Sequence, residues 1–175
     1  MSLSSGTHEF SVAAGSAGFN LNWIEAVYPG IADDCNDLSQ LHSDSDSGSL
    51  RADTSNQSYF CRSGSCATDP ARITRDGTTG TVSLVYQTSR AIDSVVVEGH
   101  TWASDPGDIT LYASTDWGST WTQVSANWSE YCSPHSDWHH YEITPASLPT
   151  GTNKVRIDLS GGTAWTPQIG HVEVE

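Results

Sequence analysis

The sequence contains one group of histidine and aspartate residues close enough together to hold a catalytic metal. The group consists of His135, Asp137, His139 and His140. Imidazole and carboxylate groups are ordinary zinc ligands, but this spacing matches no recognised ligand pattern. Glycoside hydrolysis would instead need two carboxyl groups facing one another across a cleft, and nothing in the sequence pairs the candidate acids Glu98, Glu130 and Glu142. We therefore predict that the chain is not an enzyme.

Three segments that we predict to be loops, 99–107, 127–138 and 160–167, are rich in aromatic residues. They carry Trp102, Trp128, Tyr131, Trp138 and Trp165. The apolar C–H face of a sugar ring stacks on an indole, while polar side chains at the rim orient its hydroxyl groups. Because tryptophan is usually mostly buried, Trp165 is expected to cover the core. The other four, together with a neighbouring histidine, are predicted to form a sugar-binding surface: Trp102, Trp128, Tyr131, Trp138 and His139.

The segments between these loops are predicted to be strands, because apolar and polar residues alternate in several of them, and these strands would position the loops. Segment 153–159 is the clearest, with Val155, Ile157 and Leu159 on one face. Further strands are predicted at 9–13, 81–87, 94–98, 108–114, 121–126 and 171–174. Segment 23–27 fits either a helical turn or a short strand, and segment 35–58 is predicted to be a long loop. Short strands separated by turn signals predict an all-β fold, an antiparallel β-sandwich of the jelly-roll or galactose-binding-like kind.

The turn predicted between strands 108–114 and 121–126 follows a known pattern. Ser114, Asp116, Gly118 and Trp121 occupy the fixed positions of the Asp-box, Ser-x-Asp-x-Gly-x-x-Trp. Asp116 can accept backbone N–H groups inside the turn, and Gly118 can adopt a positive φ. The pattern resembles hairpins of secreted glycan-handling proteins, including sialidases and sugar-binding β-sandwiches. If consecutive strands run antiparallel from residue 81 onward, this turn lies at the end of the sandwich opposite the aromatic loops.

Residues 94–174 resemble a β-sandwich carbohydrate-binding module of the kind attached to secreted bacterial glycoside hydrolases and polysaccharide lyases. The likeness rests on segments 108–114, 148–157 and 165–170. The resemblance implies a secreted, non-catalytic module that holds a parent enzyme at its polysaccharide and so raises the effective concentration. Two alternatives stay open. One is a small jelly-roll polysaccharide lyase or glycoside hydrolase, and the other is a structural or adhesion module that packs on a neighbouring domain.

Composition narrows the domain organisation and the partners. The 175 residues suit one domain over 4–175, after residues 1–3 that look like an expression start. A net charge of −14 with only seven lysine and arginine residues argues against nucleic acid, which requires a basic face, and favours a neutral polysaccharide. No stretch is apolar for long enough to span a bilayer, so we predict no membrane partner. We expect a monomer.

Four cysteines in a chain that is expected to be secreted predict two disulfide bonds. Cys61 and Cys66 are separated by a short segment that contains a glycine and can close on itself, so we predict that they pair. Cys35 and Cys132 would then form the long-range bond. Four cysteines permit three pairings, and the sequence does not choose among them.

An acidic stretch suggests a structural calcium ion. Asp44, Asp46 and Gly48 follow the start of a calcium-binding loop, although the later ligands and the closing glutamate are missing. The alternative is a solvated acidic loop, because runs of charged residues are usually exposed. Structural calcium is common in the domains that this chain resembles, so Asp44 and Asp46 are kept as candidate ligands.

Overall fold

A computed structural model describes residues 30–64, 66–77, 79–102, 108–161, 163 and 165–175. The strand predicted at 9–13 and the undecided segment 23–27 lie outside the described residues. The elements are β1 (Ile31–Asp33), η1 (Ser47–Ser49), β2 (Leu50–Asp53), η2 (Gln57–Tyr59), β3 (Arg72–Arg75), β4 (Val82–Gln87), β5 (Val95–Trp102), β6 (Ile109–Ser114), β7 (Thr122–Val124), β8 (Ala126–Glu130), β9 (Trp138–Pro145), β10 (Lys154–Leu159) and β11 (Gln168–Val174), where η marks a short 3-10 helix.

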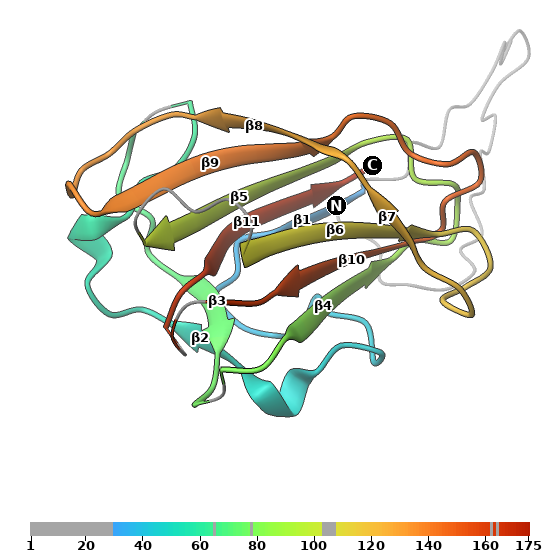
Figure 1. Ribbon diagram of the computed structural model, residues 1–175, viewed down its shortest axis with the longest axis horizontal. Helices are drawn as coiled ribbons and strands as arrows, with labels where there is room; N and C mark the ends of the chain where they lie inside the picture. The colour runs from blue at the N-terminus through green and yellow to red at the C-terminus, as the bar shows by residue number, and fades with distance from the viewer. Residues whose placement is uncertain (1–29, 65, 78, 103–107, 162, 164) are drawn as a thin grey trace, which may run out of the picture.

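The described strands form two antiparallel sheets that face one another, as Figure 1 shows. The large sheet has the order β2-β3-β11-β5-β9-β8, with β1 also paired to β11, and the small sheet has the order β4-β10-β6-β7. The prediction of an all-β, antiparallel β-sandwich is therefore confirmed. None of the helices in the described part of the chain is long and apolar enough to cross a membrane.

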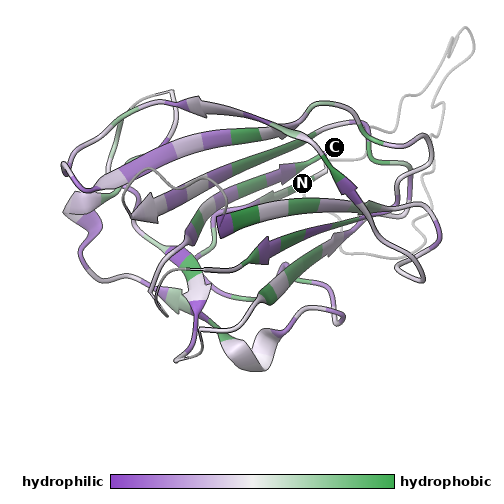
Figure 2. Cartoon of the chain, viewed as in Figure 1, coloured by the Kyte–Doolittle hydropathy of each residue, from purple (hydrophilic) through white to green (hydrophobic). Residues whose placement is uncertain are grey.

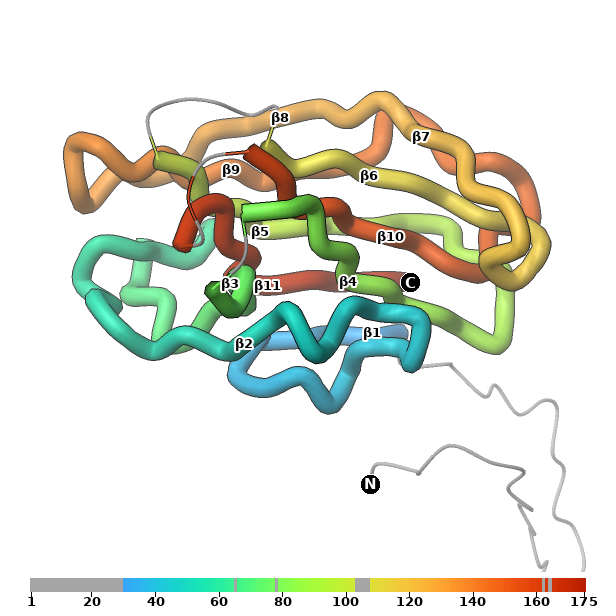
Figure 3. The backbone as a smooth tube through the Cα atoms, turned by 60° about the horizontal axis from the view of Figure 1, so that its bottom comes forward, coloured from blue at the N-terminus to red at the C-terminus, as the bar shows by residue number. Residues whose placement is uncertain are grey.

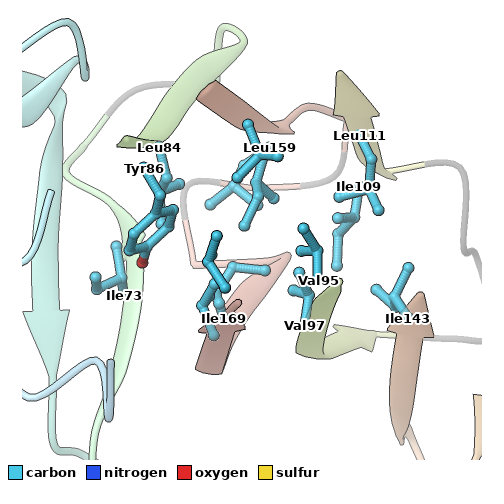
Figure 4. Close-up of a cluster of buried hydrophobic side chains, with 14 of the residues drawn as sticks. Ile73, Leu84, Tyr86, Val95, Val97, Ile109, Leu111, Ile143, Leu159 and Ile169 are labelled. Atoms are coloured by element: carbon cyan, nitrogen blue, oxygen red, sulfur yellow. The ribbon is translucent and has the colours of Figure 1, made fainter. Parts of the chain in front are cut away.

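Side chains that alternate along each strand build the core between the sheets. The small sheet contributes Leu84, Ile157 and Leu159 to the core cluster, and the large sheet contributes Val97 and Ile143; Figure 4 shows Leu84 and Leu159 on one side of this core and Val97 and Ile143 on the other. All five are fully buried. Figure 2 shows the same alternation of hydrophobic and hydrophilic residues along the strands. The apolar positions that predicted the strand at 153–159 (Val155, Ile157 and Leu159) thus all lie in the core, while Lys154 and Asp158 of the same strand are buried as well.

Two segments predicted to be loops are partly strands. β5 continues through residues 99–102, and β8 occupies 126–130, because each pairs with β9 over five or more residues. The prediction of a loop over 35–58 is also wrong in part, since β2 pairs with β3 inside it. β2 has the sequence Leu-Arg-Ala-Asp and lies at the edge of its sheet, and its four residues include only two apolar ones, which is too short a run to predict a strand.

The segment between β1 and β2 closes the open edge of β4. The backbone N–H of His42 donates to the Val85 carbonyl at 2.8 Å, and that of Asp46 donates to the Ser83 carbonyl at 3.0 Å. Figure 3 shows this segment, coloured blue to cyan, running alongside β4. These bonds satisfy backbone groups that an exposed edge would leave open.

The predicted disulfide pairing is wrong, since the described structure pairs Cys61 with Cys132. Cys61 faces Thr68 across a tight hairpin, which leaves Cys66 in the exposed turn. Cys35 is fully buried in the core and is a free thiol. The bond therefore ties the 61–68 hairpin to the chain after β8. Sequence spacing favoured the short bridge because it does not reveal which residues face one another in a hairpin.

Candidate functional site

Two tryptophans stand side by side on the outer face of the large sheet. Val97 pairs with Ile143, and both point into the core. Trp102 pairs with Trp138, and each is five residues along its strand from that core pair. Because side chains alternate between faces, this odd spacing turns the tryptophans to the outer face. Their ring centroids are 5.6 Å apart with the planes at 86°.

A third tryptophan, Trp165, completes the group. Its ring centroid lies 5.4 Å from that of Trp102 and 5.7 Å from that of Trp138. Trp165 is 41% exposed and Trp102 is 37% exposed, whereas Trp138 is only 4% exposed. The prediction that Trp165 covers the core is therefore wrong. Trp138 is the buried member of the group, and the other two present ring surface to solvent.

These tryptophans form one wall of a pocket with a volume of about 330 Å³. Tyr59, the last residue of η2, and Phe60 line the same pocket; the Phe60 ring contacts that of Trp138 at 4.6 Å, and Tyr59 is 39% exposed. The imidazole of His135 extends the aromatic surface, since its centroid lies 4.4 Å from that of Tyr59. The remaining lining residues are polar and belong to β2, the following loop and β11: Arg51, Asp53, Ser55, Asn56 and Gln168.

Asp53 supplies the pocket with an ionised acceptor. Its carboxylate accepts the backbone N–H of Ser55 at 2.8 Å and the Ser55 hydroxyl at 2.6 Å, and it pairs with the Arg51 guanidinium at 3.2 Å. Burial raises the pKa of Asp53, but these hydrogen bonds and the charges of Arg51 and Arg72 outweigh it and lower the pKa below its usual value. The charge of Arg51 is thus already balanced at the rim.

A buried layer behind the pocket holds its walls in place. The guanidinium of Arg72 stacks on the Phe60 ring at 3.8 Å and donates to the Gln168 side-chain oxygen at 2.7 Å. Gln168 in turn donates to the carbonyl of Trp165 at 2.6 Å. The backbone N–H of Trp102 donates to the Thr166 hydroxyl at 3.2 Å. The main chain at both exposed tryptophans is therefore held from behind, as a preformed binding site requires.

Of the predicted sugar-binding residues, the structure brings Trp102 and Trp138 together in the pocket. Tyr131 lies on the same outer face, where its hydroxyl donates to the Cys61 carbonyl at 3.2 Å and its ring is 6.1 Å from that of His140. Trp128 pairs with Ile143 and therefore turns toward the inner face, where its ring contacts that of Tyr141 at 5.4 Å. Neither Tyr131 nor Trp128 lines the pocket.

His139 also lies apart from the pocket. It pairs with Thr101, whose neighbours on the strand, His100 and Trp102, turn to the outer face. Alternation therefore directs His139 to the opposite face of the sheet from Trp138. There its Nδ1 atom lies 2.7 Å from the Glu130 carboxylate. The predicted surface thus divides between two faces of the large sheet.

The histidine and aspartate group at 135–140 does not converge on one point. His139 and His140 follow one another on β9 and point to opposite faces, and the His135 ring contacts that of Tyr59. Among the described residues there is no group of three or more histidine, cysteine, aspartate or glutamate side chains that could hold a metal ion.

Asp44 and Asp46 already have protein partners. The Lys154 ammonium binds the Asp44 carboxylate, and the Asp46 carboxylate accepts the backbone N–H of Ser83 at 2.9 Å. A cation at Asp44 would have to displace an ammonium group, so the two carboxylates do not fit a calcium site in this arrangement. Calcium binding stays an untested prediction.

The turn with the Asp-box pattern lies at the opposite end of the sandwich from the tryptophan pocket. In Figure 1, β5 ends and β9 begins on the left, while the turn between β6 and β7 projects on the right. Asp116 accepts the backbone N–H of Thr120 at 2.9 Å, the Thr120 hydroxyl at 2.7 Å and the Ser114 hydroxyl at 2.8 Å. The predicted hairpin and the predicted role of Asp116 in it are therefore present, but the second strand is shorter than 121–126, because β7 ends at Val124 and Ala126 begins β8 of the large sheet. Trp117, at the tip of the turn, is 54% exposed.

Sequence reasoning missed the side of the pocket formed by Tyr59, Phe60 and β2. These residues fall in or beside the segment read as a loop, and their contacts to the tryptophans join positions more than forty residues apart in the chain. The adjacent aromatic residues Tyr59 and Phe60 after a polar stretch were the available signal.

The chain matches no known protein family, and a comparison with curated proteins finds no relative.

Proposed function

We propose that the protein binds a neutral carbohydrate in the tryptophan pocket, without cleaving it. One observation carries this proposal. Among the described residues, four large hydrophobic side chains are exposed, and three of them, Tyr59, Trp102 and Trp165, line the same pocket. Exposed aromatic surface costs solvation free energy, so its concentration in a pocket with hydrogen-bonding groups favours a ligand that has both apolar and polar faces. A sugar ring has this character.

The charge of the chain favours a neutral sugar. The net charge is −14, and the one cationic side chain that lines the pocket among the described residues, Arg51, is paired with Asp53 and approaches Asp76 at 3.8 Å. An anionic sugar would have to compete with these carboxylates for the guanidinium and would meet repulsion from the rest of the surface.

A panel of immobilised neutral and acidic glycans tests the proposal directly. We expect the chain to bind members of the neutral set, and the Trp165→Ala variant to lose most of that binding. Trp117→Ala is the matched control, because it removes an even more exposed indole at the other end of the sandwich. Equal loss in both variants, or binding to acidic glycans alone, would contradict the proposed site.

The proposal extends to the biological setting expected from the resemblance. A non-catalytic sugar-binding module would act by holding a glycoside hydrolase or polysaccharide lyase at its substrate outside the cell. The Cys61–Cys132 disulfide supports an oxidising compartment, because such bonds rarely persist in the cytosol. Fusing the chain to a hydrolase whose substrate it binds should raise that enzyme's activity on the insoluble polymer but leave activity on a small soluble substrate unchanged.

One observation favours an enzymatic alternative. Glu98 and Glu142 are directly opposite one another on β5 and β9, on the outer face, and Ser63 contacts both carboxylates. Burial raises the pKa of Glu98, although Arg62 opposes this, and two carboxyl groups close to one another are the arrangement that retaining glycosidases use. Neither glutamate lines the tryptophan pocket. Release of reducing ends from a bound glycan, abolished by Glu98→Gln, would establish this alternative.

A further inference from the structure

The planes of the three indoles differ strongly, and this bears on the shape of the ligand. The interplanar angles are 86° between Trp102 and Trp138, 79° between Trp102 and Trp165, and 65° between Trp138 and Trp165. Aromatic side chains that bind a flat polysaccharide surface must share one plane, because every sugar ring of such a surface lies parallel to the next. No two of these indoles satisfy that condition.

The same angles suit a ligand that is enclosed by aromatic rings on more than one side. A sugar ring stacked face-on against one exposed indole meets the other indole along its edge, since Trp102 and Trp165 are close to perpendicular. Tyr59 also lines the pocket, and its ring and that of His135 are inclined by 42°. Trp138 is buried behind the two exposed indoles and acts as a support rather than a third stacking surface.

The size of the pocket limits how much of a glycan enters it. Its volume of about 330 Å³ lies at the lower end of the range of roughly 300–1,000 Å³ that is usual for small-molecule sites. The pocket can therefore bury only a small part of a long polysaccharide. The exposed polar lining residues Ser55 and Asn56, next to the Asp53 carboxylate, are placed to meet hydroxyl groups around the rim of one such unit.

We propose that the pocket encloses a terminal sugar unit of a neutral glycan. It does not bind an inner stretch of the glycan or the flat face of a crystalline polysaccharide. This inference rests on the proposed function. It implies that the number of chain ends, rather than the mass or surface of polysaccharide, sets how much protein binds. A chain end also presents more free hydroxyl groups than an inner unit, which gives the polar rim more to recognise.

Titration with oligosaccharide ladders tests the inference. The probes are glucose, xylose, mannose and galactose oligomers with β-1,4 linkages, from one to six units, together with the parent polymers. We expect the dissociation constant per mole of oligosaccharide to change less than about two-fold beyond the second unit. Binding capacity per gram of polymer should rise in proportion to the new ends when the polymer is cut internally.

Each contrary result has a distinct meaning. Affinity that keeps rising up to the longest oligomer, or a capacity that internal cutting leaves unchanged, would overturn the end-binding inference while leaving carbohydrate binding intact. Absence of binding to every ladder and polymer would remove the proposed function itself. Trp102→Phe serves as a second variant, because a smaller ring should weaken binding of all lengths by the same factor if only one unit occupies the pocket.

Discussion

The Nδ1 atom of His140 lies 2.7 Å from the Nδ1 atom of His100, and both side chains are fully buried beneath the pocket. Two nitrogens at this distance share one proton. The Nε2 atom of His100 faces the Asp69 carboxylate at 3.0 Å and must donate to it, so its Nδ1 accepts the proton of His140. Phe60 and Trp138, which line the pocket, also contact one another above this chain of groups.

This pair of histidines predicts acid sensitivity. Burial, with the neighbouring His100 ring, lowers the pKa of His140 to about 3, and burial lowers the pKa of His100 despite Asp69. The other charged or titratable groups nearby are Arg62, Arg72 and His139. The unfolded chain takes up protons below about pH 6.5 whereas the folded chain does not, so stability is complete above that pH and falls toward pH 3. The expected slope is roughly 1.4 kcal/mol per pH unit for each histidine that stays neutral.

Urea unfolding at a series of pH values between 7.5 and 4 measures this slope. The His140→Gln variant should lose part of it, even if the variant is less stable at pH 7.5. His42→Gln, a histidine at the surface segment beside β4, is the control and should keep the slope of the parent chain. If His140→Gln also keeps it, the buried pair is not the acid-sensitive element.

The disulfide predicts a specific pattern of thiol reactivity. Cys66 is exposed, whereas Cys35 is fully buried and burial raises the pKa of its thiol well above the usual value. A thiol reagent at neutral pH should therefore label one cysteine in the folded chain and a second only after unfolding. Peptide mapping without reduction should recover Cys61 joined to Cys132, and recovery of a Cys61–Cys66 peptide would refute the pairing.

Removing this disulfide should destabilise the fold. The bond closes a loop with a sequence separation of 71 residues, for which chain entropy predicts about 4 kcal/mol. The Cys132→Ser variant should lose stability of that order, and Cys66→Ser should lose almost none. Similar unfolding curves for the two variants would mean that the bond does not form in solution.

The alternation of apolar and polar residues within a segment predicted the strands. The site depends instead on contacts between segments that are far apart in the sequence. The alternation in Lys154–Leu159 identified a strand because each inward residue is apolar. Trp102 and Trp138 gave no such signal, because their outward direction follows from their distance along the strand to Val97 and Ile143. The partner of Cys61 and the contribution of Tyr59 depend on how the segment before β3 folds over the large sheet. No residue near these positions in the sequence encodes that placement.

The hairpin turn predicts a second effect of acid at lower pH. Hydrogen bonds from the Thr120 N–H, the Thr120 hydroxyl and the Ser114 hydroxyl lower the pKa of Asp116 to about 2. A lowered aspartate pKa means that the ionised side chain stabilises the folded state above about pH 4 and that this contribution disappears between about pH 4 and pH 2. Asp116→Asn should flatten the stability profile in that window. The exposed Asp93, changed to asparagine, should leave the profile unchanged.

The three pocket tryptophans should separate binding from stability. Trp138 is buried and its ring contacts those of Phe60, Trp102 and Trp165, so Trp138→Ala should leave a cavity and destabilise the fold by about 3–5 kcal/mol. Trp165 is much more exposed, so Trp165→Ala should leave the melting temperature nearly unchanged. A stacked ring contributes roughly 1–2 kcal/mol, so the same variant should weaken sugar binding several-fold to about thirty-fold.

Calorimetry and titration on the same preparations measure both quantities. A Trp165→Ala variant that unfolds as readily as Trp138→Ala would show that its indole supports the fold, because an exposed ring that only meets ligand adds little to folding stability. A variant that folds normally and binds like the parent chain would place the sugar elsewhere on the surface. Weakened binding at full stability is the result expected of an indole held open for its ligand.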